Sequence, residues 1–111
     1  MQYLLLIYED EKRFAESFPE AEMAEYRAFG EKNAGAIKAG KALQPTGTAQ
    51  TVRVRNGKTL TTDGPFAETK EQLGGFYLVE AASREEAAAL ASGIPAARYG
   101  SVEVRPIMVF P

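Results

Sequence analysis

Two segments of this chain, residues 2–8 and residues 73–82, are apolar on both of their alternating faces. A strand with one face in water alternates apolar and polar residues, whereas a strand covered on both sides is apolar throughout. In the first segment the two alternating sets are Tyr3, Leu5, Ile7 and Leu4, Leu6, Tyr8. We therefore predict two strands that need a cover on both faces.

Two other segments carry helix signals. Apolar and small residues recur with a period near 3.6 over residues 20–39, which predicts a helix that begins at a capping box at 17–20 and ends at Gly40. Its expected buried stripe is Met23, Tyr26, Phe29, Gly30, Ala34 and Ile37. A second capping box at 83–86 predicts a shorter helix that runs to about Ala91.

Turn signals divide the middle of the chain. Asn56-Gly57 predicts a type I′ hairpin between strands at 51–55 and 58–62, and its threonine and charged residues indicate that it is exposed. A short strand is expected at 42–45, and a short helical piece at 67–72.

The last strand is expected over residues 101–110. Val102 and Val104 face one way, while Glu103 and Arg105 share the other face. A charged pair on a covered face is either paired or lines a cleft. Glu103 and Arg105 therefore form a cross-strand or intersubunit ion pair, or they line a ligand pocket in which Arg105 binds a carboxylate or phosphate.

The order strand, helix, strand, hairpin, strand, helix, strand predicts an α+β fold. We expect a ferredoxin-like antiparallel sheet with two helices on one face. Because two helices cannot cover the second apolar face, we expect a homodimer in which two sheets pack face to face, a dimeric α+β barrel. The alternative is that residues 45–72 fold over the open face of a monomer.

Composition narrows the chemistry. The 111 residues make one domain without cysteine or histidine, which excludes disulfides, thiolate nucleophiles and Ser-His or Cys-His mechanisms. The net charge of -2 argues against dedicated nucleic-acid binding. No EF-hand spacing or glycine-rich phosphate loop occurs, so we expect no metal or other cofactor. The apolar run near the N-terminus is too short for a signal peptide or a membrane span, so we expect a cytoplasmic protein.

A rigid turn occurs at Asp63–Phe66 (DGPF). Asp63 either caps its own turn, which is a structural role, or presents a carboxylate that acts as a base or binds a cationic or hydroxyl group. Lys70 follows in a charged stretch that is either solvated surface or a partner for an anion or for Asp63. The candidate catalytic residue is Asp63, and the candidate ligand contacts are Phe66, Lys70, Glu103 and Arg105.

Residues 63–76 (DGPFAETKEQLGGF), residues 95–106 (PAARYGSVEVRP) and the opening MQYLLLIYEDE resemble the DGPF branch of the YCII-related family. The resemblance covers nearly the whole chain and implies a ferredoxin-like fold that dimerises into an α+β barrel. It also implies a gene that neighbours an extracytoplasmic-function sigma factor. The wider family has been proposed to use a histidine and an aspartate in a cleft. Asp63 corresponds to the aspartate, but the chain has no histidine, so that mechanism does not transfer.

The expected function is small-molecule binding in a cleft beside the Asp63–Phe66 turn of a cytoplasmic homodimer. Asp63 would orient or polarise the ligand, and Arg105 or Lys70 would neutralise an anionic group. Any reaction would be a weak lyase-type or isomerase-type acid–base step on a small polar or aromatic acid. The alternative is a non-enzymatic regulatory module whose exposed hairpin binds a sigma factor. A third interpretation gives the turn a role in the fold alone.

Overall fold

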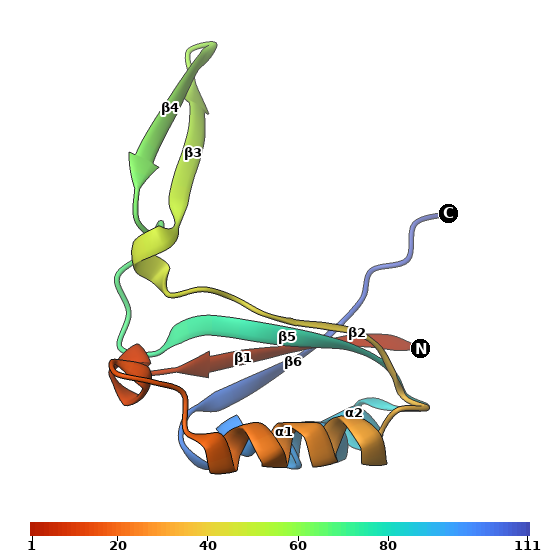
Figure 1. Ribbon diagram of the computed structural model, residues 1–111. Helices are drawn as coiled ribbons and strands as arrows, with labels where there is room; N and C mark the ends of the chain where they lie inside the picture. Colours follow the sequence, from red (N-terminus) through yellow and green to blue (C-terminus); the bar gives the residue numbers. More distant parts are fainter.

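A four-stranded antiparallel sheet carries two helices on one face, and a long hairpin extends from the other side (Figure 1). The computed structural model describes residues 1–111. The strands of the sheet are β1 (Gln2–Glu9), β2 (Ile37–Ala42), β5 (Gln72–Glu80) and β6 (Ser101–Pro106), and the hairpin strands are β3 (Gln50–Arg55) and β4 (Lys58–Asp63). The helices are α1 (Glu20–Lys32) and α2 (Arg84–Ser92), with short 3-10 turns η1 (Glu11–Phe14), η2 (Thr46–Thr48) and η3 (Pro95–Arg98).

The sheet order is β2-β5-β1-β6, and β1 pairs antiparallel with both β5 and β6. Apart from the inserted β3–β4 hairpin, this is the βαββαβ order of a ferredoxin-like fold, so the predicted fold class is confirmed. Both helices lie on the same side of the sheet in Figure 1. Neither of them is long and apolar enough to cross a membrane.

The core lies between the helices and one face of the sheet. Tyr3, Leu5 and Ile7 point into it from β1, and Leu5 is fully buried. The other members of the core are Phe29, Val79, Ala81, Ala87, Ala91, Ile94 and Ala96. Because α2 presents alanines to the sheet, it can approach closely without leaving voids. One of the two apolar faces predicted for β1 is thus covered within the chain.

The boundaries of α1 differ from those predicted. Pro19 precedes the first turn and no side chain caps it, so the capping box expected at 17–20 is wrong. The helix ends at Lys32, where the backbone N–H and the side-chain amide of Asn33 both donate to the Phe29 carbonyl, at 3.1 and 2.9 Å. These bonds satisfy a carbonyl at the helix end and let the chain leave the helix.

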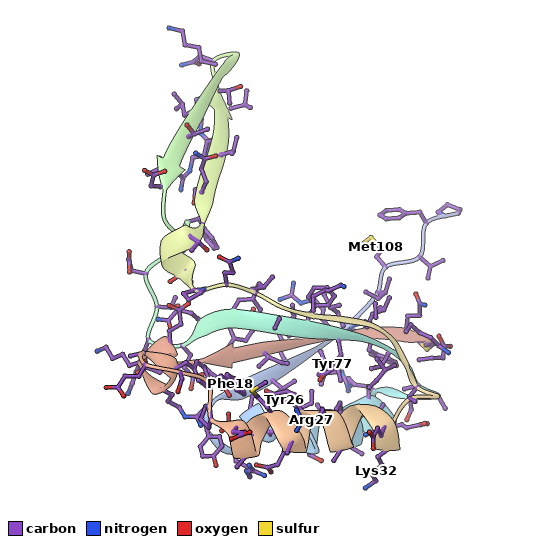
Figure 2. All side chains as sticks on the ribbon, in the orientation of Figure 1. Phe18, Tyr26, Arg27, Lys32, Tyr77 and Met108 are labelled. Carbon is purple, nitrogen blue, oxygen red and sulfur yellow. The ribbon has the colours of Figure 1, made fainter.

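Residues 37–42, which begin inside the predicted helix, form the edge strand β2, in place of the short strand expected at 42–45. Pairing with β5 satisfies the backbone groups of this segment, and that gain outweighs its helical spacing. Gly40, predicted as a helix cap, lies opposite Tyr77, and a Cβ atom there would lie 2.7 Å from the Tyr77 ring. The glycine makes room for that ring, which Figure 2 labels between the sheet and the helices. The Tyr77 ring packs on Phe29, with ring centroids 5.2 Å apart.

The capping box predicted at 83–86 is confirmed, whereas the segment 67–72 and the end of the last strand differ from the prediction. The second capping box is present, because the Ser83 hydroxyl accepts from Glu86 N–H and the Glu86 carboxylate accepts from Ala82 N–H, both at 3.1 Å. No helical piece forms at 67–72, because residues 67–71 are bends and irregular chain and Gln72 begins β5. The last strand ends at Pro106, and the tail that follows it leaves the sheet on the side away from the helices, where Figure 2 labels Met108.

The hairpin of residues 50–63, called the arm below, is confirmed as an exposed element. Asn56 and Gly57 have positive φ values of 52° and 74°, as a type I′ turn requires. The two strands pair only with each other, and every arm residue except Thr51 is exposed. Glu11 fixes the segment before the arm, because its carboxylate accepts from the backbone N–H and the hydroxyl of Thr46, at 2.7 and 3.0 Å.

Candidate functional site

The face of the sheet without helices, called the open face below, presents a second set of apolar side chains. Its half-buried members are Leu4, Leu6, Phe76 and Leu78. Leu6 lies opposite Phe76 of β5 on one side and opposite Glu103 of β6 on the other. The arm and the tail rise from this side of the sheet without lying across it (Figure 1). Residues 45–72 therefore do not form the self-covered monomer that was the alternative to a dimer.

Three polar side chains are joined on the β6 side of the open face. The Tyr8 hydroxyl donates to Glu103 Oε1 at 3.3 Å, and Arg105 Nε donates to Glu103 Oε2 at 3.1 Å. Arg105 Nη2 also forms an ion pair with that carboxylate, while Arg105 Nη1 has no partner in the chain. Glu103 and Arg105 are thus paired with each other within one strand and stay partly exposed, which differs from the cross-strand or intersubunit ion pair that the sequence suggested.

The charges of this triad, Tyr8, Glu103 and Arg105, follow from its contacts. The hydrogen bond from Arg105 lowers the pKa of Glu103, so this carboxylate is ionised at neutral pH. Partial burial, with the negative charge of Glu103 beside it, raises the pKa of the Tyr8 phenol. Tyr8 is therefore a protonated donor. The free edge of Arg105, whose side chain is 65% exposed, can bind an anion.

The Asp63–Phe66 turn lies at the base of the arm. Gly64 has a φ of 97°, its N–H donates to the Ala49 carbonyl at 2.7 Å, and its own carbonyl accepts from the Thr51 hydroxyl at 2.9 Å. The carboxylate of Asp63 makes no hydrogen bond in the chain and is exposed. Gly64 and its backbone bonds hold this turn, so the side-chain cap that was the structural interpretation of Asp63 is absent.

The other two loop candidates are also exposed. Phe66 is 81% exposed, and Lys70 has no ion pair. Two side-chain hydrogen bonds connect their loop to the sheet. The Ser101 hydroxyl, opposite Tyr8, donates to Glu71 Oε1 at 2.9 Å, and Gln72 Nε2 donates to the Thr69 carbonyl at 2.6 Å. The structure therefore brings Glu103 and Arg105 together with Tyr8. It does not bring Asp63, Phe66 or Lys70 into hydrogen-bonding or ionic contact with them.

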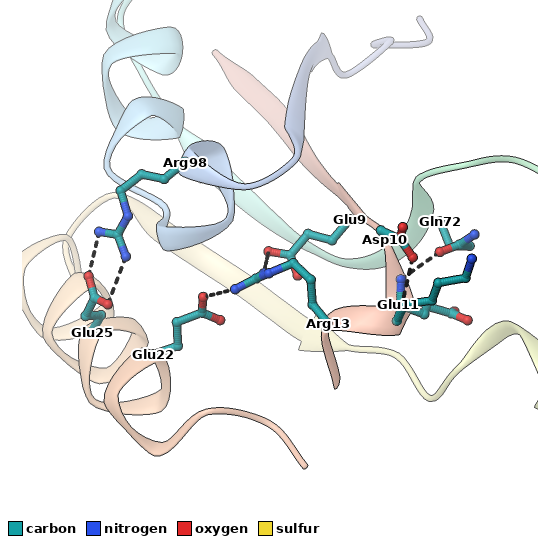
Figure 3. A network of polar contacts seen from close by, with 9 residues as sticks. Glu9, Asp10, Glu11, Arg13, Glu22, Glu25, Gln72 and Arg98 are labelled. Atoms are coloured by element: carbon teal, nitrogen blue, oxygen red, sulfur yellow. Dashed lines mark hydrogen bonds and ion pairs between the residues drawn. The ribbon is translucent and has the colours of Figure 1, made fainter. Parts of the chain in front are cut away.

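A second Glu–Arg cluster lies buried at the same end of β1 (Figure 3). Glu9 and Glu22 are only 6% and 4% exposed. Arg13 lies between them, with Nη1 3.3 Å from Glu9 and Nη2 2.5 Å from Glu22, and its guanidinium lies 3.8 Å from the centre of the Tyr99 ring. Burial raises the pKa of Glu9, and Arg13 only partly offsets that effect. The cluster ties β1, η1 and α1 together.

Sequence reasoning missed parts of both clusters. Tyr8 was placed on an apolar strand, and only its register with β6, where Leu6 lies opposite Glu103 and Tyr8 opposite Ser101, brings its hydroxyl to Glu103. Glu9, Asp10 and Glu11 have the sequence pattern of an exposed end of a strand, so they gave no sign of a buried charge. The one usable signal was periodicity, since Glu9 continues the alternation of the buried Tyr3, Leu5 and Ile7.

Two hollows lie on the helix side of the chain. One, of about 270 Å³, lies between α1 and α2 and is lined by Phe29, Lys32 and Leu90 among others. The other, of about 240 Å³, lies between α2 and β6. Neither of these two hollows includes a predicted site residue. No group of three or more acidic side chains is arranged to hold a metal ion.

Comparisons with known proteins agree with this fold. A family model described as the YCII-related domain matches residues 1–111. An uncharacterized protein of Rhizobium meliloti (strain 1021) is 41% identical over 117 residues, covering 99% of this chain and 94% of that protein. A solved structure of a 5-chloro-2-hydroxyhydroquinone dehydrochlorinase from Burkholderia phenoliruptrix AC1100, in complex with 2,5-dihydroxybenzoquinone, matches with a TM-score of 0.51 and 14% identity over 97% of this chain and 94% of that chain. At 14% identity, the match to the dehydrochlorinase shows a shared fold.

Proposed function

The chain belongs to the YCII-related domain family, and from this premise we propose that it acts as a homodimer that binds a small anionic molecule on the open face of its sheet. The observation that carries the proposal is the triad of Tyr8, Glu103 and Arg105 beside the apolar side chains of Leu6 and Phe76. Such a mixture of an apolar floor and a few directed polar groups is typical of small-molecule sites.

The groups on this face favour a flat ligand with a carboxylate or an ionised hydroxyl. Leu6 and Phe76 provide a surface for a ring, Tyr8 provides a hydroxyl, and Arg105 has free donors for two oxygen atoms. The fold relative that binds 2,5-dihydroxybenzoquinone supports this class, since that ligand is a small oxygenated ring. We propose small aromatic or polar acids as the ligand class.

In this proposal, the second chain encloses the ligand site on the open face. Two open faces packed about a twofold axis would cover the apolar residues Leu4, Leu6, Phe76 and Leu78 of each chain, and the exposed loop that carries Phe66 lies at the rim. Removing water from the triad would strengthen its contacts with an anion. Any chemistry would be a weak lyase-type or isomerase-type proton transfer, with Glu103 or Asp63 as the base.

Titration calorimetry with 2,5-dihydroxybenzoate and 2,5-dihydroxybenzoquinone tests the ligand site. Arg105→Gln should weaken binding at least about tenfold, because it removes a charge-assisted contact. Lys58→Gln at the tip of the arm is the matched control, since it removes the same charge away from the open face, and it should bind as the wild type does. Equal affinities for the two variants, or no binding of either probe at millimolar concentration, would contradict the proposed site.

A second candidate function is the regulatory module that binds an extracytoplasmic-function sigma factor. The exposure of the whole arm supports it, because unpaired strand edges can accept a strand from another protein. A pull-down with the sigma factor encoded beside this gene tests it. A complex that is lost when residues 51–62 are replaced by a short glycine linker supports this function, and no complex at micromolar concentration contradicts it.

A further inference from the structure

The arm has an unequal distribution of charge on its two faces. Residues directly opposite each other in an antiparallel pair share a face. The pairing register therefore places Val52, Val54, Thr59 and Thr61 on one face, called the neutral face below, and Arg53, Arg55, Lys58 and Leu60 on the other, basic face. Gln50 and Asp63 lie on the same side as the neutral face, at the base of the arm. The valines are 59% and 60% exposed, although β-branched residues on a strand normally pack against something.

A free two-stranded hairpin is only marginally stable in water, so a well-formed arm without a neighbour needs support. Its direction is fixed at the base by the Gly64–Ala49 and Thr51–Gly64 bonds and by Glu11, which anchors Thr46. The arm extends from the open-face side of the sheet, away from the helices (Figure 1). It therefore projects into the space that a second chain on the open face would occupy.

We propose that the neutral face of each arm packs on a second copy of this chain, so that the partner's arm closes one side of the ligand site on the open face. This inference rests on the proposed homodimer. Each arm strand has six residues, a length of about 20 Å, so the arm is long enough to cross much of a four-stranded sheet.

Charge decides which face of the arm turns inward. The basic face carries three cations and no acid, and burying them unpaired would be costly. The open face offers little compensation, because Lys41 and Arg105 are themselves cations. Its two acids are already paired, Glu103 with Arg105 and Glu80 with the N-terminal amine. The neutral face carries no cation, and the one acid on its side, Asp63, lies at the base of the arm. Its valines match the apolar side chains of Leu6 and Phe76.

The test compares two equally placed charges on opposite faces of the arm. Val54→Asp should raise the dissociation constant of the dimer at least tenfold in sedimentation experiments, whereas Leu60→Asp should change it less than threefold. Because the arm is outside the core, both variants should keep the wild-type circular dichroism. A dimer weakened equally by both variants, or by neither, would overturn the proposed packing of the arm.

A second measurement does not depend on these variants folding well. The chain has no cysteine, so one introduced thiol reports on its own surroundings. In Val54→Cys the thiol should react at least tenfold more slowly with a maleimide in the dimer than after dilution to monomers, whereas in Leu60→Cys it should react equally fast in both. Equal reactivity at position 54 in dimer and monomer would overturn the inference.

The two proposals fail in different ways. A wild-type protein that sediments as a 12.1 kDa monomer at all concentrations contradicts the dimer itself and the arm contact with it. A wild-type dimer that forms without protecting position 54 overturns only the arm contact and leaves the proposed ligand site in place. Loss of sigma-factor capture on arm replacement, with an unchanged dimer, assigns the arm to the regulatory function and also overturns the contact.

Discussion

Two Glu–Arg clusters lie at the end of β1, on opposite faces of the same strand. Glu9 points toward the helices and meets Arg13 in the interior, while Tyr8 points to the open face and meets Glu103 and Arg105. The residue types are similar, but the surroundings differ. The buried cluster pairs its charges inside the fold, although Glu9 Oε1, Arg13 Nη1 and Glu22 Oε2 make no hydrogen bond. Arg105, in contrast, is 65% exposed and keeps donors free. Burial thus separates charges that support the fold from charges available to a ligand.

The two clusters should differ most in how much the free energy of unfolding falls when the arginine of each is removed. Arg13→Ala leaves the buried carboxylates of Glu9 and Glu22 without a partner and should lower the free energy of unfolding by about 3–5 kcal/mol. Arg105→Ala removes an exposed ion pair and should leave stability unchanged within error. Urea unfolding measures both. Similar losses for the two variants would show that the clusters do not differ in this way.

The apolar residues of β1 should show the same contrast. Leu5→Ala leaves a cavity at a fully buried position and should lower the free energy of unfolding by about 2–5 kcal/mol. Leu6→Ala, on the open face, should cost about 1 kcal/mol in dilute protein, because its side chain is only half-buried in one chain. Thermal or urea unfolding at two protein concentrations checks this. A cost for Leu6→Ala that grows with concentration supports the dimer, and a large cost in the monomer contradicts the contrast.

A smaller effect is expected at the base of the arm. Gly64→Ala places a side chain at a φ of 97° and should destabilise the turn by about 1 kcal/mol. Asp63→Asn should leave stability unchanged, since its carboxylate has no partner in the chain. Hydrogen exchange of the arm amides measures both. If Asp63→Asn opens the arm as much as Gly64→Ala does, the aspartate holds the turn after all.

The smallest effect concerns pH. Burial raises the pKa of Glu9 in the folded chain above its unfolded value. The favourable contribution of its protonated form is complete below the unfolded pKa, near 4.5 for a glutamate carboxyl in water, and is lost as pH rises through the raised folded pKa. Glu9→Gln should remove this loss, so the stability of the wild type relative to Glu9→Gln should fall between acidic and neutral pH. A constant difference over that range would contradict a raised pKa.

Local rules predicted the elements whose signals lie close together in sequence. The Asn56-Gly57 turn, the capping box at Ser83 and the apolar faces of β1 all formed as expected. The rules failed where a distant partner decides the outcome. Residues 37–42 pair with β5, which cannot be read from their own helical spacing. The same holds for the site, because the contact between Tyr8 and Glu103 joins residues 95 positions apart.

Glu9 and Tyr8 are consecutive residues, and this adjacency has a consequence for ligand binding. A Cβ atom on Gly100 would lie 2.1 Å from the Tyr8 carbonyl, so neighbouring backbone presses directly on this end of the strand while Arg13 holds the side chain of Glu9. The Tyr8 phenol therefore keeps its orientation before a ligand binds. Little conformational freedom would then be lost on association, and even a molecule with few atoms could be held there.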